Sequence, residues 1–296
     1  MAAITVATLS KGTNFDPHLV KDLITKVKGK SSLAILSAQD PVSFNGNKEF
    51  IFDMPNEIDI VAENGAKSHG GITLEPVVIN PIKFEYGARI SDEFLYASEE
   101  EQLDILSKFN DGFAKKVARG LDLAGFHGVN PRTGQPSTVV NGNCFDTIVQ
   151  QTVTYAAANA DDNLDDAVAL VQASGDVTGM ALAPAFGAAM GKIKANGIAL
   201  YPEFRFGQKP TSFAGLETDV NKTVSDIGDD KAVIGDFQNM FQWGYSKQIP
   251  LEIIPYGDPD NSGQDLKGHN QIYIRAEVYL GWGILDAASF ARIVSQ

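Results

Sequence analysis

Hydrophobic residues recur every three or four positions near the start of the chain, which predicts an amphipathic helix over residues 16–28. Asp16 is suited to cap this helix, Pro17 to its first turn and Gly29 to its end. The hydrophobic positions that share one face are Leu19, Val20, Leu23, Ile24 and Val27. Because such a stripe needs a covering surface, we expect this helix to dock on another element or another subunit.

Between residues 44 and 90 the hydrophobic period changes to two, which predicts β-strands. The alternating positions are Phe50, Phe52, Met54, Ile58, Ile60, Ile72, Leu74, Ile82, Phe84 and Tyr86. The polar, glycine-containing run 63–71 interrupts them and predicts the tip of a long hairpin. A lone two-stranded hairpin is marginally stable in water, so we expect other chains to support it in an oligomer.

The clearest pattern predicts a helix from Glu99 to His127, roughly 40 Å long at about 1.5 Å per residue. Ser98 and Glu101 have the spacing of a capping box, and Gly128 suits the position after the helix. The predicted apolar face is Leu103, Leu106, Phe109, Phe113, Val117, Leu121 and Ala124. Three internal glycines lower helix propensity unless close packing requires them: Gly112, Gly120 and Gly125.

The second half of the chain alternates helices and strands. A helix is predicted around residues 164–171, and we interpret the acidic cluster 161–166 as stabilising its N-terminus rather than as paired catalytic carboxylates. A strand at 180–183 leads into a helix expected to end at Gly197. Further strands are predicted at 232–237, 251–254 and 272–280. This mixture indicates the α+β class.

Composition and charge exclude several kinds of protein. The 296 residues are 44% hydrophobic and carry a formal net charge of −13, which gives no electrostatic basis for a broad phosphate-binding surface. Cys144 is the only cysteine, so no intrachain disulfide is possible. The first residues do not form a signal peptide, and the apolar stretches are shorter than the roughly 20 residues of a membrane span. We expect no membrane partner.

Candidate chemistry is sparse, and we predict no catalytic residue, no metal and no cofactor. The four histidines are far apart in sequence, and motifs for nucleotide binding or α/β-hydrolase activity are missing. Residues 258–263 resemble the start of a calcium loop, but His269 stands where a glutamate is expected, so an exposed turn is the preferred interpretation. The aromatic run 201–206 is interpreted as a loop anchor rather than a nucleic-acid site.

Several short segments carry a resemblance to a known family. They are 62–68 (AENGAKS), 90–95 (ISDEFL), 232–237 (AVIGDF), 274–277 (IRAE) and 287–290 (AASF). In their order and spacing they resemble the major capsid proteins of tailed bacteriophages with the Hong Kong 97-type fold, which encapsulin shells share. The resemblance covers nearly the whole chain.

This resemblance implies an α+β fold with an N-terminal arm at 1–37 and an extended β-hairpin loop at 38–82. It implies a peripheral domain with a spine helix at 83–130 and 245–277, and an axial domain at 131–244 and 278–296. The subunit would assemble with itself through hexamers and pentamers into an icosahedral virion capsid around double-stranded DNA. Assembly would occur in the host cytoplasm with a scaffold protein, a portal and a decoration protein. An encapsulin-like compartment with protein cargo is the alternative.

The residues expected at subunit interfaces belong to the arm, the hairpin tip and the start of the long helix. They are Leu19, Leu23, Val27, Glu63, Lys67, Glu99 and Glu101. Lys67 lies near the lysine that some relatives use for covalent cross-links, although a solvated or salt-bridged tip residue is the simpler interpretation. A soluble hydrolase or lectin-like binder is a third hypothesis, and it predicts a compact pocket with converging polar groups.

Overall fold

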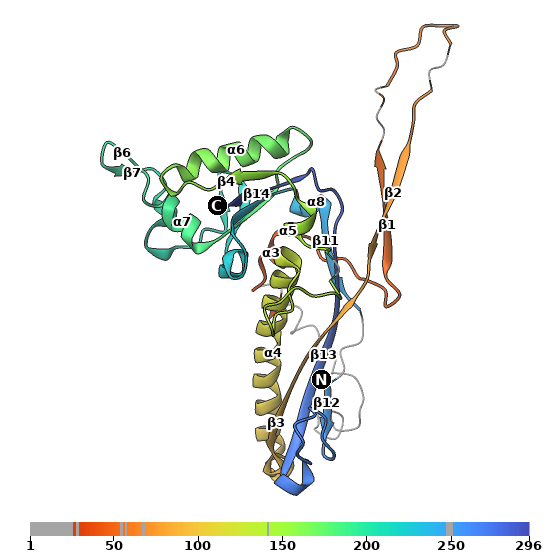
Figure 1. The fold of residues 1–296 in the computed structure, drawn as a ribbon, viewed down its shortest axis with the longest axis vertical. Coiled ribbons are helices and arrows are strands. Elements are labelled where there is room, and N and C mark those ends of the chain that lie inside the picture. Colours follow the sequence, from red (N-terminus) through yellow and green to blue (C-terminus); the bar gives the residue numbers. More distant parts are fainter. Residues whose placement is uncertain are drawn as a thin grey trace.

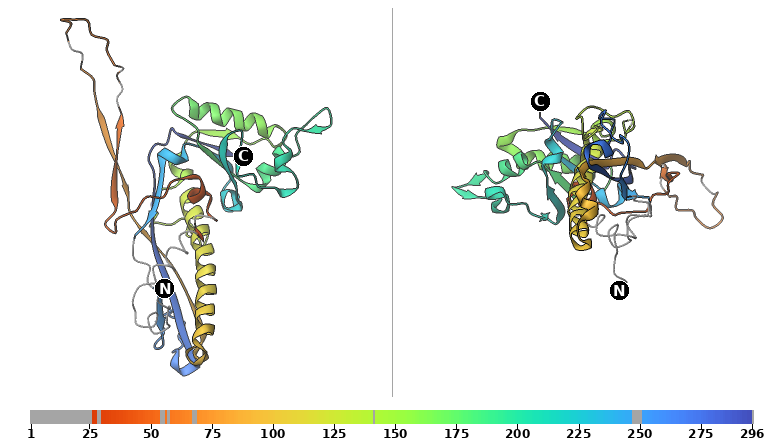
Figure 2. Two further views of the ribbon diagram at one scale, coloured as in Figure 1. Left: turned by 180° about the vertical axis from the view of Figure 1, so that it is seen from behind. Right: turned by 90° about the horizontal axis from the view of Figure 1, so that it is seen from below.

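The computed structural model describes residues 26–27, 30–53, 56, 58–66, 69–140, 142–246 and 251–295. It has three visibly different parts (Figure 1). A long hairpin projects from the body, an elongated part holds a long helix beside a sheet, and an α/β part with the C-terminus lies at one end of that helix. The views from behind and from below show the same separation (Figure 2). No helix of the described segments is both long and apolar enough to cross a lipid bilayer.

The elongated part is organised around strand β13, Gln271–Ile284. One edge of β13 pairs antiparallel with β3, Ile82–Ser91. The other edge of β13 pairs with two strands in succession. Strand β12, Leu251–Ile254, pairs with its first half, and strand β11, Phe241–Tyr245, pairs with its last residues. Alternate residues of β13 are buried between Ile274 and Leu280, which is the predicted period-two pattern, whereas residues 280–284 are buried without interruption.

The long helix α4 runs beside this sheet from Glu99 to His127, the predicted bounds. Its capping box is present, since the Ser98 hydroxyl accepts from the backbone N–H of Glu101 and the Glu101 carboxylate accepts from that of Ser98. Gly128 ends the helix in the left-handed region, with φ at 66°. The predicted apolar face is buried at Leu106, Phe113, Val117, Leu121 and Ala124.

The glycines of α4 differ in their surroundings. A Cβ on Gly125 would lie 2.4 Å from Cδ1 of the buried Leu33, and one on Gly120 would lie 3.1 Å from the Phe84 ring. A Cβ on Gly112 would meet nothing within 4 Å. Close packing therefore accounts for Gly125 and Gly120 but not for Gly112.

Substitutions at two of these glycines should act in opposite directions. Gly112→Ala should raise the free energy of unfolding by about 0.5–1 kcal/mol, because alanine restricts the unfolded chain and fits open space. Gly125→Val should lower it by about 1–3 kcal/mol, because the added side chain overlaps Leu33. Urea unfolding of unassembled subunits measures both values, and equal effects at the two sites would contradict this packing.

A buried carboxylate attaches the segment that precedes the hairpin to α4. Asp122 of α4 is fully buried and faces the N-terminus of α3, Ser32–Leu36. Its two oxygens accept hydrogen bonds from Ser31 Oγ, Ser32 N, Leu33 N, Thr223 Oγ1 and Asn221 Nδ2. Burial raises the pKa of Asp122 to about 6, although these hydrogen bonds oppose the rise.

The α/β part contains a six-stranded mixed sheet in the order β4-β14-β10-β5-β9-β8. The strands are Thr152–Thr154 (β4), Phe290–Val294 (β14), Asp230–Gly235 (β10), Gly179–Leu182 (β5), Leu216–Val220 (β9) and Ser212–Phe213 (β8). Helix α6, Ala160–Gln172, packs on β4, β14 and β10. The far end of the α/β part holds helix α7, Pro184–Met190, and a small hairpin (Figure 1). The hairpin consists of β6, Lys194–Ala195, and β7, Ile198–Ala199.

An aromatic cluster joins the end of α4 to both sheets. Phe145, on the short helix α5 (Phe145–Ile148), lies at its centre. Its ring centroid is 5.6 Å from that of Phe126, 5.6 Å from Phe241 and 5.1 Å from Phe290. Phe237 also contacts Phe290, at 5.2 Å. The segments 232–237 and 287–290, which carry part of the family resemblance, therefore meet in one core.

Two sequence predictions differ from the structure, and a third lies almost entirely outside the described residues. The predicted strand at Ile58 and Ile60 does not form, because β1, Asn47–Asp53, and β2, Thr73–Ile79, pair only up to Asp53 opposite Thr73. Helix α7 ends at Met190, and Gly197 instead supplies a positive φ in the turn between β6 and β7. The helix predicted at 16–28 lies outside the described residues except for Lys26 and Val27, which are helical.

Candidate assembly surfaces

The hairpin ends in a tight turn. Gly65 N donates to Ala62 O over 2.8 Å, and Asn64 takes a left-handed conformation with φ at 64°. Glu63 lies in this turn and is exposed. The turn confirms that the polar run beginning at Glu63 forms the hairpin tip.

The hairpin exposes hydrophobic side chains that its own chain does not cover. Ile58 is 93% exposed, Ile60 is 96% exposed and Ile72 is 65% exposed. Single exposed hydrophobic residues are common, but these three isoleucines all lie on one projecting loop. Exposed hydrophobic residues gathered on one projection are typical of a surface that is buried against another molecule.

The base of the hairpin is held firmly to the body. Asp40 N donates to Trp243 O over 2.9 Å, next to a bridge between Gln39 and Trp243. A Cβ on Gly244 would lie 1.6 Å from the Asp40 carbonyl oxygen, so the two backbones are in direct contact. The exposed tip is therefore carried on a fixed support, which suits a part that must reach a defined position.

A groove of about 620 Å³ lies between β3, α4 and the loop 129–140. Hydrophobic side chains that remain partly exposed line it, including Tyr86 at 46% and Val139 at 68%. Lys116 and Arg132 also line it and are exposed. The groove thus combines apolar surface with positive charge, whereas the hairpin tip combines isoleucines with Asp59 and Glu63.

The other residues predicted at interfaces have different surroundings. Val27 is fully buried, and its neighbour Lys26 forms an ion pair with Asp111 of α4. Glu99 is the first residue of α4, and Glu101 is exposed and completes the capping box. Leu19, Leu23 and Lys67 lie outside the described residues. Interface roles for all of these residues remain predictions.

An arginine binds the acidic loop that resembles a calcium site. The Arg89 guanidinium, on β3, donates to Asp258 Oδ1 over 2.7 Å and to Asp260 Oδ2 over 2.9 Å. It also donates to Ser262 Oγ over 2.6 Å and to Gln264 O over 2.9 Å. The hydrogen bond from Arg89 holds the pKa of Asp260 well below its usual range. An internal cation therefore takes the place that a metal ion would need.

Removal of this arginine should loosen the loop. In Arg89→Met the carboxylates of Asp258 and Asp260 lose their counter-charge, so we expect a protease to cleave within residues 256–266 much faster than in the wild type. Lys83→Met, on the same strand, is the matched control because Lys83 pairs with Glu277 instead. Limited proteolysis with mass spectrometry measures the rates, and unchanged cleavage in Arg89→Met would show that Arg89 does not fix the loop.

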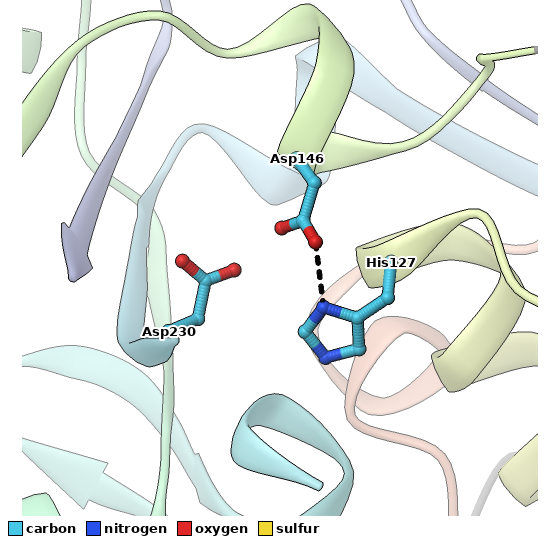
Figure 3. A group of neighbouring side chains, drawn as sticks. All are labelled: His127, Asp146 and Asp230. Atoms are coloured by element: carbon cyan, nitrogen blue, oxygen red, sulfur yellow. Dashed lines mark hydrogen bonds and ion pairs between the residues drawn. The ribbon is translucent and has the colours of Figure 1, made fainter. Parts of the chain in front are cut away.

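One cluster in the described segments has the residue types of a metal site. His127, Asp146 and Asp230 each offer a ligand atom, and these atoms lie within 4.8 Å of one another (Figure 3). Arg292, however, binds both carboxylates, with its Nη2 2.6 Å from Asp146 Oδ1 and 2.9 Å from Asp230 Oδ1. A cation here would compete with the guanidinium of Arg292, so we assign the cluster to an ion-pair network and not to a metal site. Sequence spacing contains no signal for it.

An α+β chain with a projecting hairpin, a fixed hairpin base and a long supporting helix is the architecture of a shell-forming subunit. The sequence model of the phage capsid family matches residues 14–295, and the chain therefore belongs to the phage capsid family. It is a major capsid protein of the tailed-phage, Hong Kong 97 type, a structural component of the virion capsid and not an enzyme. The predicted family and function are confirmed.

Solved structures support this assignment. A chain of Mycobacterium phage Ogopogo has 32% identity and a TM-score of 0.76, covering 90% of this chain and 92% of that one. A chain of Gordonia phage Cozz has 25% identity and a TM-score of 0.74, covering 90% and 87%. The capsid of a native GTA particle, computed with C5 symmetry, shares the fold at 17% identity, with a TM-score of 0.64 and 89% of each chain covered. No curated protein gives a significant sequence match.

Proposed function

We propose that this subunit forms hexameric and pentameric rings that close into an icosahedral head around double-stranded DNA. Capsid proteins of this family self-assemble into shells. The observation that carries the proposal is the hairpin, whose isoleucines at positions 58 and 60 are more than 90% exposed on a rigidly held support. Subunits arranged head to tail in a ring can cover such a projection, because each interface joins one surface of a subunit to a different surface of the next subunit.

Within this arrangement, the hairpin tip of one copy lies in the groove between β3 and α4 of the adjacent copy. The groove has both apolar and polar walls, with Lys116 and Arg132 as well as Glu85, and the tip has isoleucines with Asp59 and Glu63. Apolar burial would provide most of the stabilisation, while the opposite charges would select the register and accelerate association.

A charge-exchange experiment tests this contact. Asp59→Lys combined with Glu63→Lys should reduce shell yield by about tenfold or more, as should Lys116→Glu combined with Arg132→Glu, because each pair then faces like charges. A chain with all four substitutions should recover most of the yield. Electron microscopy and sedimentation measure the yield. Failure of the combined variant to improve on either pair would exclude this pairing.

The division of the chain follows from the same proposal. Residues 1–37 act as the N-terminal arm and 38–82 as the extended loop. The peripheral domain comprises 83–130 and 245–277, and the axial domain comprises 131–244 and 278–296. Exposed hydrophobic residues at the end of the α/β part support its place near a ring axis, notably Ile198 at 73% and Phe206 at 90%. The C5 symmetry with which the GTA capsid was computed supports the pentamer.

Further partners belong to this proposal as well. A scaffold protein, a portal and a decoration protein would assist assembly in the host cytoplasm, and the DNA would be enclosed without sequence-specific contacts. The acidic chain, with a net charge of −13, agrees with loose enclosure. An encapsulin-like compartment is the alternative, and nuclease-protected DNA rather than protein cargo inside purified particles would distinguish the two.

A further inference from the structure

Four ionisable side chains meet where α4 ends against the six-stranded sheet, and Figure 3 draws three of them, His127, Asp146 and Asp230. His127 is the last residue of α4, Asp146 lies on α5, Asp230 begins β10 and Arg292 lies on β14. The side chain of His127 is 1% exposed and that of Asp230 is 0% exposed. These residues belong to elements that are far apart in sequence, so their contacts fix how the long helix is seated on the α/β part.

Both ring nitrogens of His127 face hydrogen-bond acceptors. Nδ1 lies 2.9 Å from Asp146 Oδ2, and Nε2 lies 3.0 Å from the backbone carbonyl oxygen of Thr223. A neutral imidazole has a single N–H, so it can satisfy only one ionised carboxylate or carbonyl at a time. The doubly protonated imidazolium donates to both, and its place at a helix C-terminus also favours positive charge.

The charge balance of the network requires the same proton. Arg292 binds both carboxylates, with its Nε 3.1 Å from Asp230 Oδ1 and its Nη2 2.6 Å from Asp146 Oδ1. One guanidinium and two carboxylates leave an excess negative charge, which is costly in a buried site. One further proton makes the network neutral, and the imidazole of His127, both of whose nitrogens face acceptors, is the group placed to carry it.

We propose that His127, Asp146, Asp230 and Arg292 form a proton-dependent joint that seats α4 on the six-stranded sheet when the extra proton is bound and releases that contact when the proton is lost. The proposal goes beyond shell formation and is independent of it, since all four side chains belong to one chain. It makes the relative position of the long helix and the α/β part sensitive to pH.

The surroundings make the contact sensitive to small movements. A Cβ on Gly228 would lie 2.7 Å from His127 Nδ1, so the backbone before β10 closes directly on the ring. Thr223, on the short helix η4 (Lys222–Ser225), accepts from His127 through its carbonyl and donates to the buried Asp122 through its hydroxyl over 2.7 Å. Other charges close by in the chain include Asp229 and Lys231, which flank Asp230, and Asp226, which pairs with both Arg119 and Lys222.

The pKa directions agree with this geometry. Burial alone would lower the pKa of His127, but the hydrogen bond and charge of Asp146 outweigh it and raise that pKa above its ordinary value. Burial and the neighbouring Asp146 carboxylate raise the pKa of Asp230 to about 7, against the effect of Arg292. Burial acts to raise the pKa of Asp146, but His127 and Arg292 outweigh it and lower that pKa below its ordinary value.

The sign of the pH effect follows. A group whose pKa is raised in the folded state contributes stability that is complete below its unfolded pKa and is lost as the pH rises through its folded pKa. For Asp230 the loss begins at the ordinary pKa of 3.8 and is complete above about 7, and for His127 it continues above the ordinary pKa of 6.5, so the joint weakens as the pH rises. The lowered pKa of Asp146 acts in the opposite direction, and its contribution is lost only in acid.

Nitrogen NMR of histidine-labelled particles observes the proton directly. The chain has four histidines, so the spectrum is simple, and loss of one signal in His127→Gln assigns the resonance. We expect both ring nitrogens of His127 to be protonated at about pH 6.5 and one to lose its proton by about pH 8.5. A single neutral tautomer of His127 that persists down to about pH 6 would overturn the proposal.

Hydrogen exchange on full-length subunits measures the release. After correction for chemical exchange, segments 142–151 and 221–231 should open about tenfold more often at about pH 8.5 than at about pH 6.5. In Asp230→Asn the charges of Arg292 and Asp146 cancel without the extra proton, so the opening frequencies at the two pH values should differ by less than about twofold. The matched control Asp162→Asn, at an exposed position of α6, should keep the wild-type response. An equal response in Asp230→Asn and the wild type would refute the joint.

Discussion

Shells should not form when Ile58→Asp and Ile60→Asp are combined, although the subunit should remain folded. Both side chains are more than 90% exposed in the isolated chain, so the substitutions remove no internal packing. Burial of an isoleucine against a neighbour stabilises an interface by about 1.5–3 kcal/mol, and an aspartate there adds a desolvation cost instead. Because every subunit of a shell makes the same contact, the loss is repeated throughout the particle.

Sedimentation and electron microscopy should therefore show capsomers or monomers for the aspartate variant, with circular dichroism and the unfolding midpoint unchanged. Ile58→Val combined with Ile60→Val is the conservative control, and it should assemble with near-normal yield because most of the apolar area remains. Normal shell yield from the aspartate variant would remove the hairpin tip from the interface.

The largest effect on folding is expected for Asp122→Ala. This substitution leaves five donors around a fully buried site without their acceptor, among them Ser31 Oγ, Leu33 N and Thr223 Oγ1. We expect the free energy of unfolding to fall by about 3–5 kcal/mol, because each unsatisfied buried donor is costly. The segment that leads to the hairpin should detach first, since Asp122 binds the N-terminus of α3.

Asp104→Ala provides the matched control on the same helix. Asp104 is exposed and pairs with Lys108 at the i,i+4 spacing, so its removal should change stability by less than about 0.5 kcal/mol. Urea unfolding measures both variants. A loss in Asp122→Ala no larger than that in Asp104→Ala would show that this carboxylate does not hold α3 on α4.

The elements with strong local signals could be predicted from the sequence. Helix α4 has a capping box, a continuous apolar face and a terminal glycine, and its bounds agree with the prediction. Strand β12 also has the predicted bounds. The hairpin follows from its alternating pattern and turn residues, whereas Ile58 and Ile60 do not continue the pairing. Period two indicates an extended backbone, but it does not indicate whether a partner strand is present.

Tertiary contacts explain what the sequence could not show. Asp122 occupies a position of α4 that a helical wheel treats as an ordinary polar residue, and only its donors from two other segments, 31–33 and 221–223, reveal its role. Arg89 and the loop at Asp258 are about as far apart in sequence as His127 and Arg292, and no spacing rule connects either pair. The sequence alone could not suggest that the hairpin tip binds the groove with Arg132, because residues from several segments form that groove only in the folded chain.

Cryo-electron microscopy of assembled particles tests the central claim most directly. The account predicts rings of six and five subunits in which the hairpin tip at Ile58 and Ile60 lies in the groove beside Arg132 of the adjacent copy. The tip isoleucines should then be buried. A closed shell whose hairpins lie free in solvent, or fold back on their own subunit, would contradict it.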